Sequence, residues 1–161
     1  MGNYSDFETE FVQRTLALIE QYNVMIEDKP FNEQYNYTLT LNCLLGLIVL
    51  PKERALTFLP SVRLTQELKT EMGLHQSQLP RPEMTLRDLI KKMRNSVAHF
   101  SVEVESVSEA RLVDRIVFKD DQEHVYAIFS APELLPFLRY YAALLLANMT
   151  RRREVPASDS V

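Results

Sequence analysis

The stretch from Thr85 to Phe100 reads TLRDLIKKMRNSVAHF, and its pattern decides the fold class of the chain. On a helical wheel of about 100° per residue, its large apolar residues all fall within about 60° of Met93. A stripe of this width predicts an amphipathic helix that packs on the core of a helical protein, capped at its start by Thr85 to Asp88. The stripe consists of Leu86, Leu89, Ile90, Met93, Val97 and Phe100.

Arg94, Asn95 and His99 lie outside this stripe, at about 100°, 200° and 240° from Met93 on the wheel. Arginine offers a charged, planar fork for a phosphate, and histidine can take or give a proton near neutral pH. Such a pair can cleave a phosphodiester without a metal ion. Arg94 and His99 diverge by about 140°, and the small Ala98 between them would let another surface approach. Two copies of the helix facing each other would therefore form a more continuous cleft than one helix provides.

Positive charge is concentrated around these residues. Between Arg81 and His99 there are five lysines and arginines against two acidic residues, whereas the whole chain has a net charge of −4. The acidic total argues against a protein that coats nucleic acid generally. Arg87, Lys91 and Lys92 are candidate RNA contacts, and a solvated helix face is the alternative interpretation of the same charges.

The composition is that of an ordinary globular protein, because 46% of the 161 residues are apolar and 25% are charged. A chain of this length fits one domain with a substantial core. The three glycines are too few for a β-sandwich, a Gly-rich phosphate loop or a Rossmann turn. We therefore expect a mainly helical single domain over residues 1–150 and a flexible tail over residues 151–161.

We expect neither a metal nor a cofactor, and a location in the cytoplasm. Cys43 is the only cysteine, so neither a disulfide framework nor a cysteine-based zinc site can form. Three scattered histidines without a paired carboxylate provide no ligand set for a metal. The N-terminus lacks a signal-peptide pattern. The longest apolar run, about a dozen residues, is too short to cross a bilayer.

The rest of the chain divides into further helices and one β segment. A capping box of Ser5 and Glu8 predicts a first helix to about residue 27. A central helix is expected over residues 32–50, and residues 52–73 hold one or two short helices with a restart at Ser61. A second capping box, Ser130 and Glu133, opens a last helix to about residue 150. Between residues 101 and 129 the apolar period changes to two, which predicts a β-hairpin and leaves room for a third short strand.

The residues Arg94, Asn95 and His99 resemble the RxxxxH motif, with a polar residue after the arginine, of the HEPN superfamily. The helical layout matches as well, with the motif late in a bundle and one long helix after it. Residues 35–51, YNYTLTLNCLLGLIVLP, look like the second helix of a plasmid-encoded bacterial branch. The resemblance implies a HEPN-like bundle of four to five helices. The small β-hairpin before the last helix would be a branch-specific insertion.

The resemblance also implies an activity, that of a metal-independent endoribonuclease with a toxin or defence role. Two copies would meet through the motif helix, and an antitoxin or regulatory protein could be a further partner. Arg94 would bind the scissile phosphate, Asn95 would support it, and His99 would be the general acid and base. Attack by the ribose 2′-hydroxyl would leave a 2′,3′-cyclic phosphate and a 5′-hydroxyl.

Two other functions stay open on the sequence. The first is a non-catalytic HEPN module that binds RNA, a nucleotide or a protein partner, in keeping with the acidic net charge. The second is a helical bundle whose motif only holds a dimer together. Replacement of His99 distinguishes the three functions. It would remove cleavage in the ribonuclease, change nothing in the binding module, and dissociate the dimer in the structural bundle.

Overall fold

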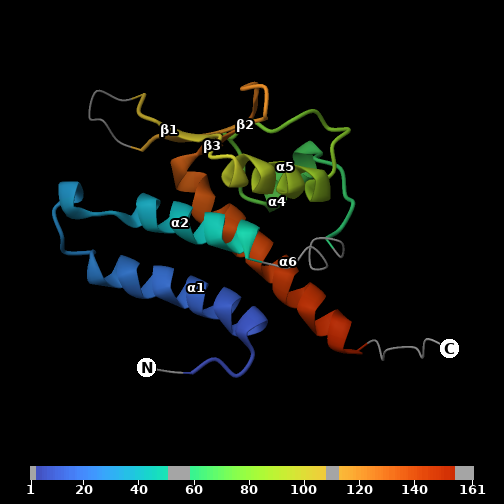
Figure 1. Ribbon diagram of the computed structural model, residues 1–161. Coiled ribbons are helices and arrows are strands. Elements are labelled where there is room, and N and C mark those ends of the chain that lie inside the picture. The colour runs from blue at the N-terminus through green and yellow to red at the C-terminus, as the bar shows by residue number, and fades with distance from the viewer. Residues whose placement is uncertain (1–2, 51–58, 108–112, 155–161) are drawn as a thin grey trace.

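The computed structural model describes residues 3–50, 59–107 and 113–154, with side chains described as far as Arg151 (Figure 1). It is mainly helical, with a small antiparallel sheet before the last helix, as the sequence predicts. The helices are α1 (Phe7–Met25), α2 (Asn36–Val49), α4 (Gln66–Glu71), α5 (Leu86–Ala98) and α6 (Leu134–Glu154). The strands are β1 (Val102–Glu105), β2 (Arg115–Lys119) and β3 (Val125–Ser130). Two 3-10 turns, η1 (Phe31–Glu33) and η2 (Ala131–Glu133), precede α2 and α6.

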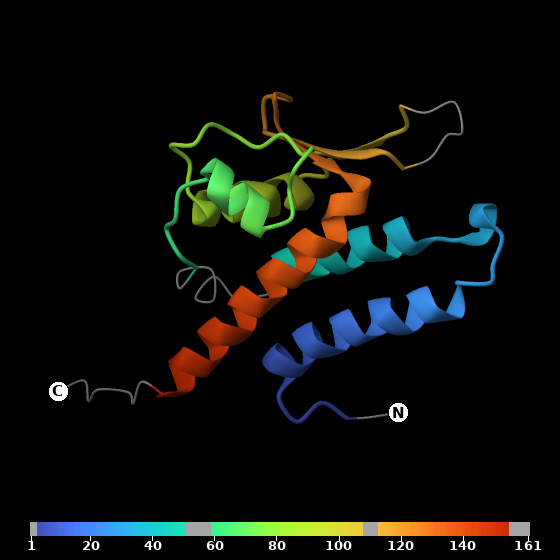
Figure 2. The same ribbon diagram turned by 180° about the vertical axis from the view of Figure 1, so that it is seen from behind.

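Helix α2 is central to the bundle, as its mostly apolar sequence predicts. It packs against α1, α5 and α6, and its residues Leu44, Leu47 and Ile48 are fully buried. Helices α1 and α2 lie side by side, and α6 crosses them diagonally (Figures 1 and 2). None of the described helices is long and apolar enough to cross a membrane.

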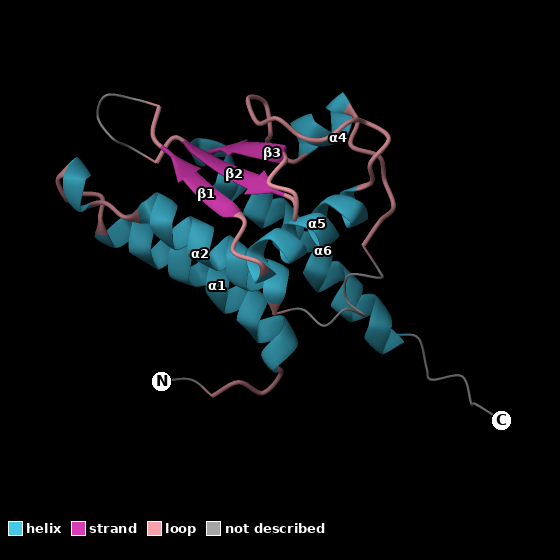
Figure 3. Ribbon diagram, turned by 45° about the horizontal axis from the view of Figure 1, so that its top comes forward, coloured by secondary structure: helices cyan, strands magenta, loops and turns pink. Residues whose placement is uncertain are grey.

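The three strands follow one another in the order β1, β2, β3, each antiparallel to the next (Figure 3). One face of the sheet is buried through Ile116, Phe118, Ala127 and Phe129. The ring of Phe129 lies 5.0 Å from that of Phe137 on α6, so aromatic packing joins the sheet to the last helix. The pairing register shifts between Phe118 and Lys119, where the hairpin approaches its turn.

Both predicted capping boxes are wrong, because no side chain of the N-cap residue caps the start of α1 or of η2. Helix α1 starts after Asp6, and the Glu10 carboxylate accepts hydrogen bonds from the backbone N–H groups of Ser5 (2.9 Å) and Asp6 (3.1 Å). The Glu133 carboxylate accepts from the backbone N–H groups of residues 75–77, at 2.8 to 2.9 Å. Glu133 therefore binds a loop that is distant in sequence instead of capping the helix that follows it.

The expected restart of a helix at Ser61 is also wrong. Arg63 instead forms an isolated antiparallel bridge with Thr85, and α4 begins after Thr65, whose hydroxyl accepts from the N–H of Leu68 at 3.2 Å. Residues 51–58 of this segment lie outside the described residues. At the other end of the chain, α6 continues beyond Thr150 to Glu154, since arginine is a good helix former.

The core stripe of α5 is confirmed except at Phe100. Leu86, Leu89, Ile90 and Met93 are buried and Val97 is partly buried, whereas Phe100 is 92% exposed. The helix ends at Ala98, so the wheel angle no longer describes where Phe100 points. Its φ of 59° places it in the left-handed region, which turns the chain away from the helix axis.

Gly73 lies just after α4 and packs against Pro136 of α6. Its surroundings support a prediction about stability. Its φ is +75°, and a Cβ atom there would lie 2.5 Å from Cβ of Pro136. The N–H groups of Gly73 and Leu74 donate to the carbonyls of Thr70 and Lys69, the Schellman arrangement that favours glycine. Left-handed strain and overpacking together should make Gly73→Ala cost about 2–4 kcal/mol of unfolding free energy in denaturant titrations.

Gly46→Ala is the matched control for that substitution. Gly46 lies within α2, and an added Cβ would meet only Cζ of Phe11, at an ordinary 3.8 Å. Alanine is the better helix former, so this variant should be neutral or up to about 1 kcal/mol more stable. Equal stability of the two variants would contradict the packing of Gly73 against α6.

Candidate functional site

The end of α5 places the motif residues at the junction of the bundle and the sheet. Ser101 donates its backbone N–H to the carbonyl of Ser96 (2.7 Å), and Phe100 donates to Val97 (3.2 Å). This is again a Schellman arrangement, with Phe100 at the position that glycine usually takes. His99 is the C-cap residue of α5, so its side chain stands where the chain turns into β1.

Asn95 and His99 are exposed and line one pocket of about 240 Å³. The pocket lies between the last turns of α5 and the turn that joins β2 to β3. Its other lining residues come from both of these elements and from the residue before β1: Lys92, Ser96, Ser101, Lys119, Asp120, Asp121 and Tyr126. The helix and the sheet therefore form the pocket together.

Ser96 fixes α5 against the sheet beside this pocket. It is only 3% exposed, and its hydroxyl donates to the backbone carbonyl of Lys119 at 2.6 Å. A hydroxyl has one hydrogen, so the Tyr126 hydroxyl, 2.7 Å away, is the donor in the contact between the two. Burial raises the pKa of Tyr126 to about 12, which keeps the phenol protonated and able to donate.

Three of the charged side chains around the pocket, Lys92, Lys119 and Asp120, have specific partners. Lys119 Nζ lies 2.6 Å from Glu103 Oε1, and this hydrogen bond raises the pKa of the lysine. Lys92 Nζ lies 5.1 Å from the centroid of the Tyr126 ring, within range of a cation–π contact. Asp120 Oδ1 accepts from the N–H of His124 (2.9 Å), which lowers the pKa of that carboxyl. The pocket is thus polar and contains fixed charges of both signs.

Arg94 lies apart from Asn95 and His99 within one chain. Its side chain is partly buried and is not among those that line the pocket. It is close enough to Tyr141 of α6 that its charge opposes the rise in the pKa of that tyrosine, which burial causes. The separation agrees with the angle of about 140° that the helical wheel predicts for Arg94 and His99.

The three candidate RNA contacts have different surroundings. Arg87 is partly buried, and its Nε donates to the carbonyl of Leu59 at 2.9 Å, so its guanidinium contributes to the fold. Lys91 and Lys92 are exposed. Only Lys92 of the three lines the pocket that contains His99.

Sequence reasoning missed the contributions of Ser96, Lys119, Asp121 and Tyr126. One signal was available for Ser96, which lies about 60° from Met93 on the wheel and is therefore a polar residue on the core side of the helix. The other three come from the β2–β3 hairpin, and no local pattern connects that hairpin to α5.

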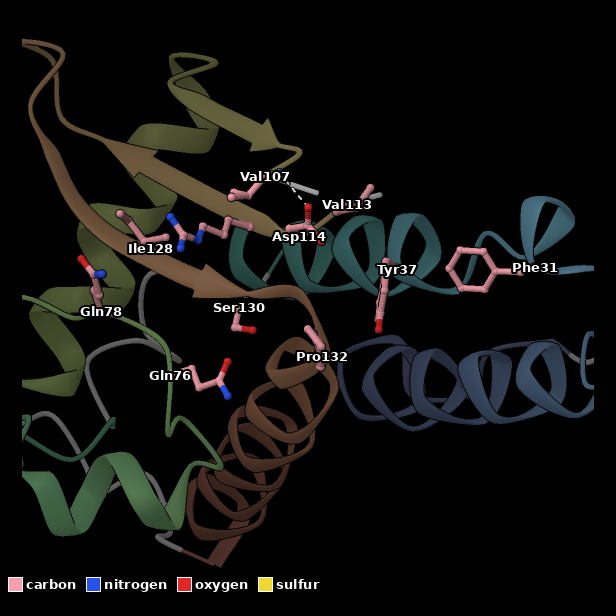
Figure 4. Close-up of a pocket in the computed structure, with 11 residues that line it drawn as sticks. Phe31, Tyr37, Gln76, Gln78, Val107, Val113, Asp114, Ile128, Ser130 and Pro132 are labelled. Atoms are coloured by element: carbon pink, nitrogen blue, oxygen red, sulfur yellow. Dashed lines mark hydrogen bonds between the residues drawn. The ribbon is translucent and has the colours of Figure 1, made fainter. Parts of the chain in front are cut away.

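A larger cavity of about 660 Å³ lies between the sheet, the loop around Gln76 and Gln78, and the start of α2 (Figure 4). It shares no lining residue with the pocket of His99. Arg115 and Asp114 provide charges of opposite sign there, and the described lining contains neither histidine nor cysteine. The smaller pocket is therefore the better candidate for proton-transfer chemistry.

Comparison with known families identifies the family of the chain. A family model described as HEPN pEK499 p136 matches residues 1–152. The chain belongs to this HEPN family, from a plasmid-associated branch. The matched span includes both α5 and the three-stranded sheet. No match was found among curated proteins or among solved structures.

Proposed function

We propose that this HEPN protein is a metal-independent endoribonuclease that acts as a homodimer. The observation that carries the proposal is the common pocket of Asn95 and His99, both exposed, at the end of the helix that bears the motif. A toxin or defence role in the cytoplasm, controlled by an antitoxin or regulatory protein, is the biological setting that the family resemblance favours.

The proposed reaction is an internal transfer of the phosphate. His99 takes the proton of a ribose 2′-hydroxyl, and the 2′ oxygen attacks the adjacent phosphorus. The bond from phosphorus to the 5′ oxygen breaks, and the protonated imidazole returns its proton to that oxygen. The guanidinium of Arg94 stabilises the charge that grows on the phosphoryl oxygens, and Asn95 supports the phosphate by hydrogen bonding. The products are a 2′,3′-cyclic phosphate and a 5′-hydroxyl.

The dimer is needed because one chain keeps Arg94 away from the pocket of His99. In a symmetric pair, the Arg94 of the partner subunit would complete each site. The surface next to His99 suits such an approach, since Ala98 is small and exposed. Phe100 is 92% exposed, and its left-handed backbone holds it outward. Aromatic side chains are enriched at protein interfaces, so Phe100 is the expected contact of the second copy.

The proposal is tested by incubating the purified protein with RNA in excess EDTA. We expect cleavage to continue, because every group in the reaction belongs to the protein or to the RNA. The new 3′ ends should be 2′,3′-cyclic phosphates, and an all-deoxy strand of the same sequence should stay intact. Loss of cleavage in EDTA, or cleavage of the deoxy strand, would contradict the proposed reaction.

A non-catalytic HEPN module is the second candidate. The position of Arg94 favours it, because a single chain, or a dimer formed elsewhere, would leave His99 without an arginine. It predicts RNA or partner binding without cleavage products and without an effect of His99→Ala. A purely structural role of the motif predicts instead that the motif variants dissociate the dimer, which sedimentation would detect.

A further inference from the structure

The pocket beside His99 is suited to a neutral part of an RNA ligand. Two lysines, Lys92 and Lys119, and two aspartates, Asp120 and Asp121, line it. These charges cancel, and Lys119 is also neutralised by Glu103 at 2.6 Å. A second phosphate would therefore meet more negative than positive charge there. A base carries no net charge and avoids this repulsion.

The size and the hydrogen-bonding groups of the pocket also fit a single base. Its volume of about 240 Å³ lies below the roughly 300–1,000 Å³ of sites that hold a whole small molecule. Asn95 and Ser101 can donate and accept, Lys92 can only donate, and an ionised Asp121 can only accept. Unstacked bases in single-stranded RNA are recognised by such mixed sets of groups.

We propose that this pocket binds the base next to the scissile phosphate, and that it prefers bases with an exocyclic amino group. The inference rests on the proposed ribonuclease function and assigns a role to the inserted sheet, which supplies Lys119, Asp121 and Tyr126. Amino groups of adenine and cytosine can donate to the carboxylate of Asp121. Uracil has no exocyclic amino group, and its one ring donor, the N3–H, lies between two carbonyl oxygens that the carboxylate repels.

Asp121 is the better of the two aspartates for a test. Asp120 holds the β2–β3 turn, because its Oδ1 accepts from the backbone N–H groups of Gln122 (3.0 Å) and His124 (2.9 Å). Asp121 is exposed at the tip of that turn. Its replacement by alanine should therefore change the pocket without changing the fold. Asp28→Ala is a matched control, because Asp28 is exposed between α1 and η1, outside the pocket.

The experiment measures binding of the full chain to short labelled oligonucleotides of deoxyadenosine, deoxycytidine or deoxyuridine by fluorescence anisotropy. These strands lack the attacking hydroxyl, so binding is measured without cleavage. We expect the adenine and cytosine strands to bind about tenfold more tightly than the uracil strand, the effect of one hydrogen bond to a charged group. Asp121→Ala should remove this preference, and Asp28→Ala should keep it.

Equal binding of the three strands, no measurable binding, or an unchanged preference in Asp121→Ala would overturn the base pocket. Failure of the base pocket and failure of the ribonuclease are distinguishable. A preference that depends on Asp121 together with intact RNA in EDTA would support the pocket and contradict the nuclease. Cleavage in EDTA without such a preference would support the nuclease and contradict the pocket.

Discussion

Replacing His99 by alanine is expected to lower the rate of RNA cleavage by about 10²–10⁴-fold, the usual contribution of a positioned acid–base group. The imidazole is the proton carrier of the proposed reaction and borders the pocket. Its loss should leave the fold intact, because the side chain is exposed and the C-cap contacts of His99 come from its backbone. The measurement is the single-turnover rate on a labelled RNA in EDTA, with thermal unfolding recorded alongside.

His75→Ala is the matched control for the His99 variant. His75 is exposed as well, and the Glu133 carboxylate binds its backbone N–H rather than its ring. It lines neither the pocket of His99 nor the larger cavity beside the sheet. This variant should cleave at the rate of the unmodified protein. A His99→Ala protein that retains that rate would remove His99 from the mechanism.

Replacing Arg94 by alanine should lower the cleavage rate by about 10²–10³-fold, as loss of a preorganised group that stabilises transition-state charge does. Arg94→Lys should restore only part of the rate, because an ammonium group cannot form the two parallel hydrogen bonds of a guanidinium. Both variants are assayed in the same single-turnover experiment.

Arg139→Ala controls for the general loss of an arginine. Arg139 is exposed and lies 3.5 Å from Glu20, a surface pair of small energetic weight. Because Arg94 is partly buried near Tyr141, the unfolding free energy of its variants must be measured too. A loss of activity that follows only from a loss of folded protein would contradict the assigned role of Arg94.

The local features of α5 were predictable because they depend on nearby residues. The cap at Thr85 and the buried stripe through Met93 follow from helical periodicity. The end of the helix was not predictable in this way. Phe100 has the left-handed backbone conformation that ends the helix, and this position is usually occupied by glycine. A helix that was expected to reach Phe100 therefore stops at Ala98.

Features that depend on distant residues could not be predicted from local patterns. Glu133 matched a capping box, yet it binds the loop at residues 75–77, far away in sequence. The positions of Arg94 and His99 on the helix followed from its period alone. The hairpin that completes the pocket follows α5 in the chain, and its contact with Ser96 is a tertiary one.

The central claim, a composite site shared by two copies, is tested most directly by co-expressing the Arg94→Ala and His99→Ala chains. Each variant alone should cleave only at its strongly reduced rate. Mixed dimers contain one site with an intact His99 and an intact Arg94 of the partner subunit. If half of the dimers are mixed, about a quarter of the wild-type cleavage rate should return. A mixture no more active than the separate variants would contradict the composite site.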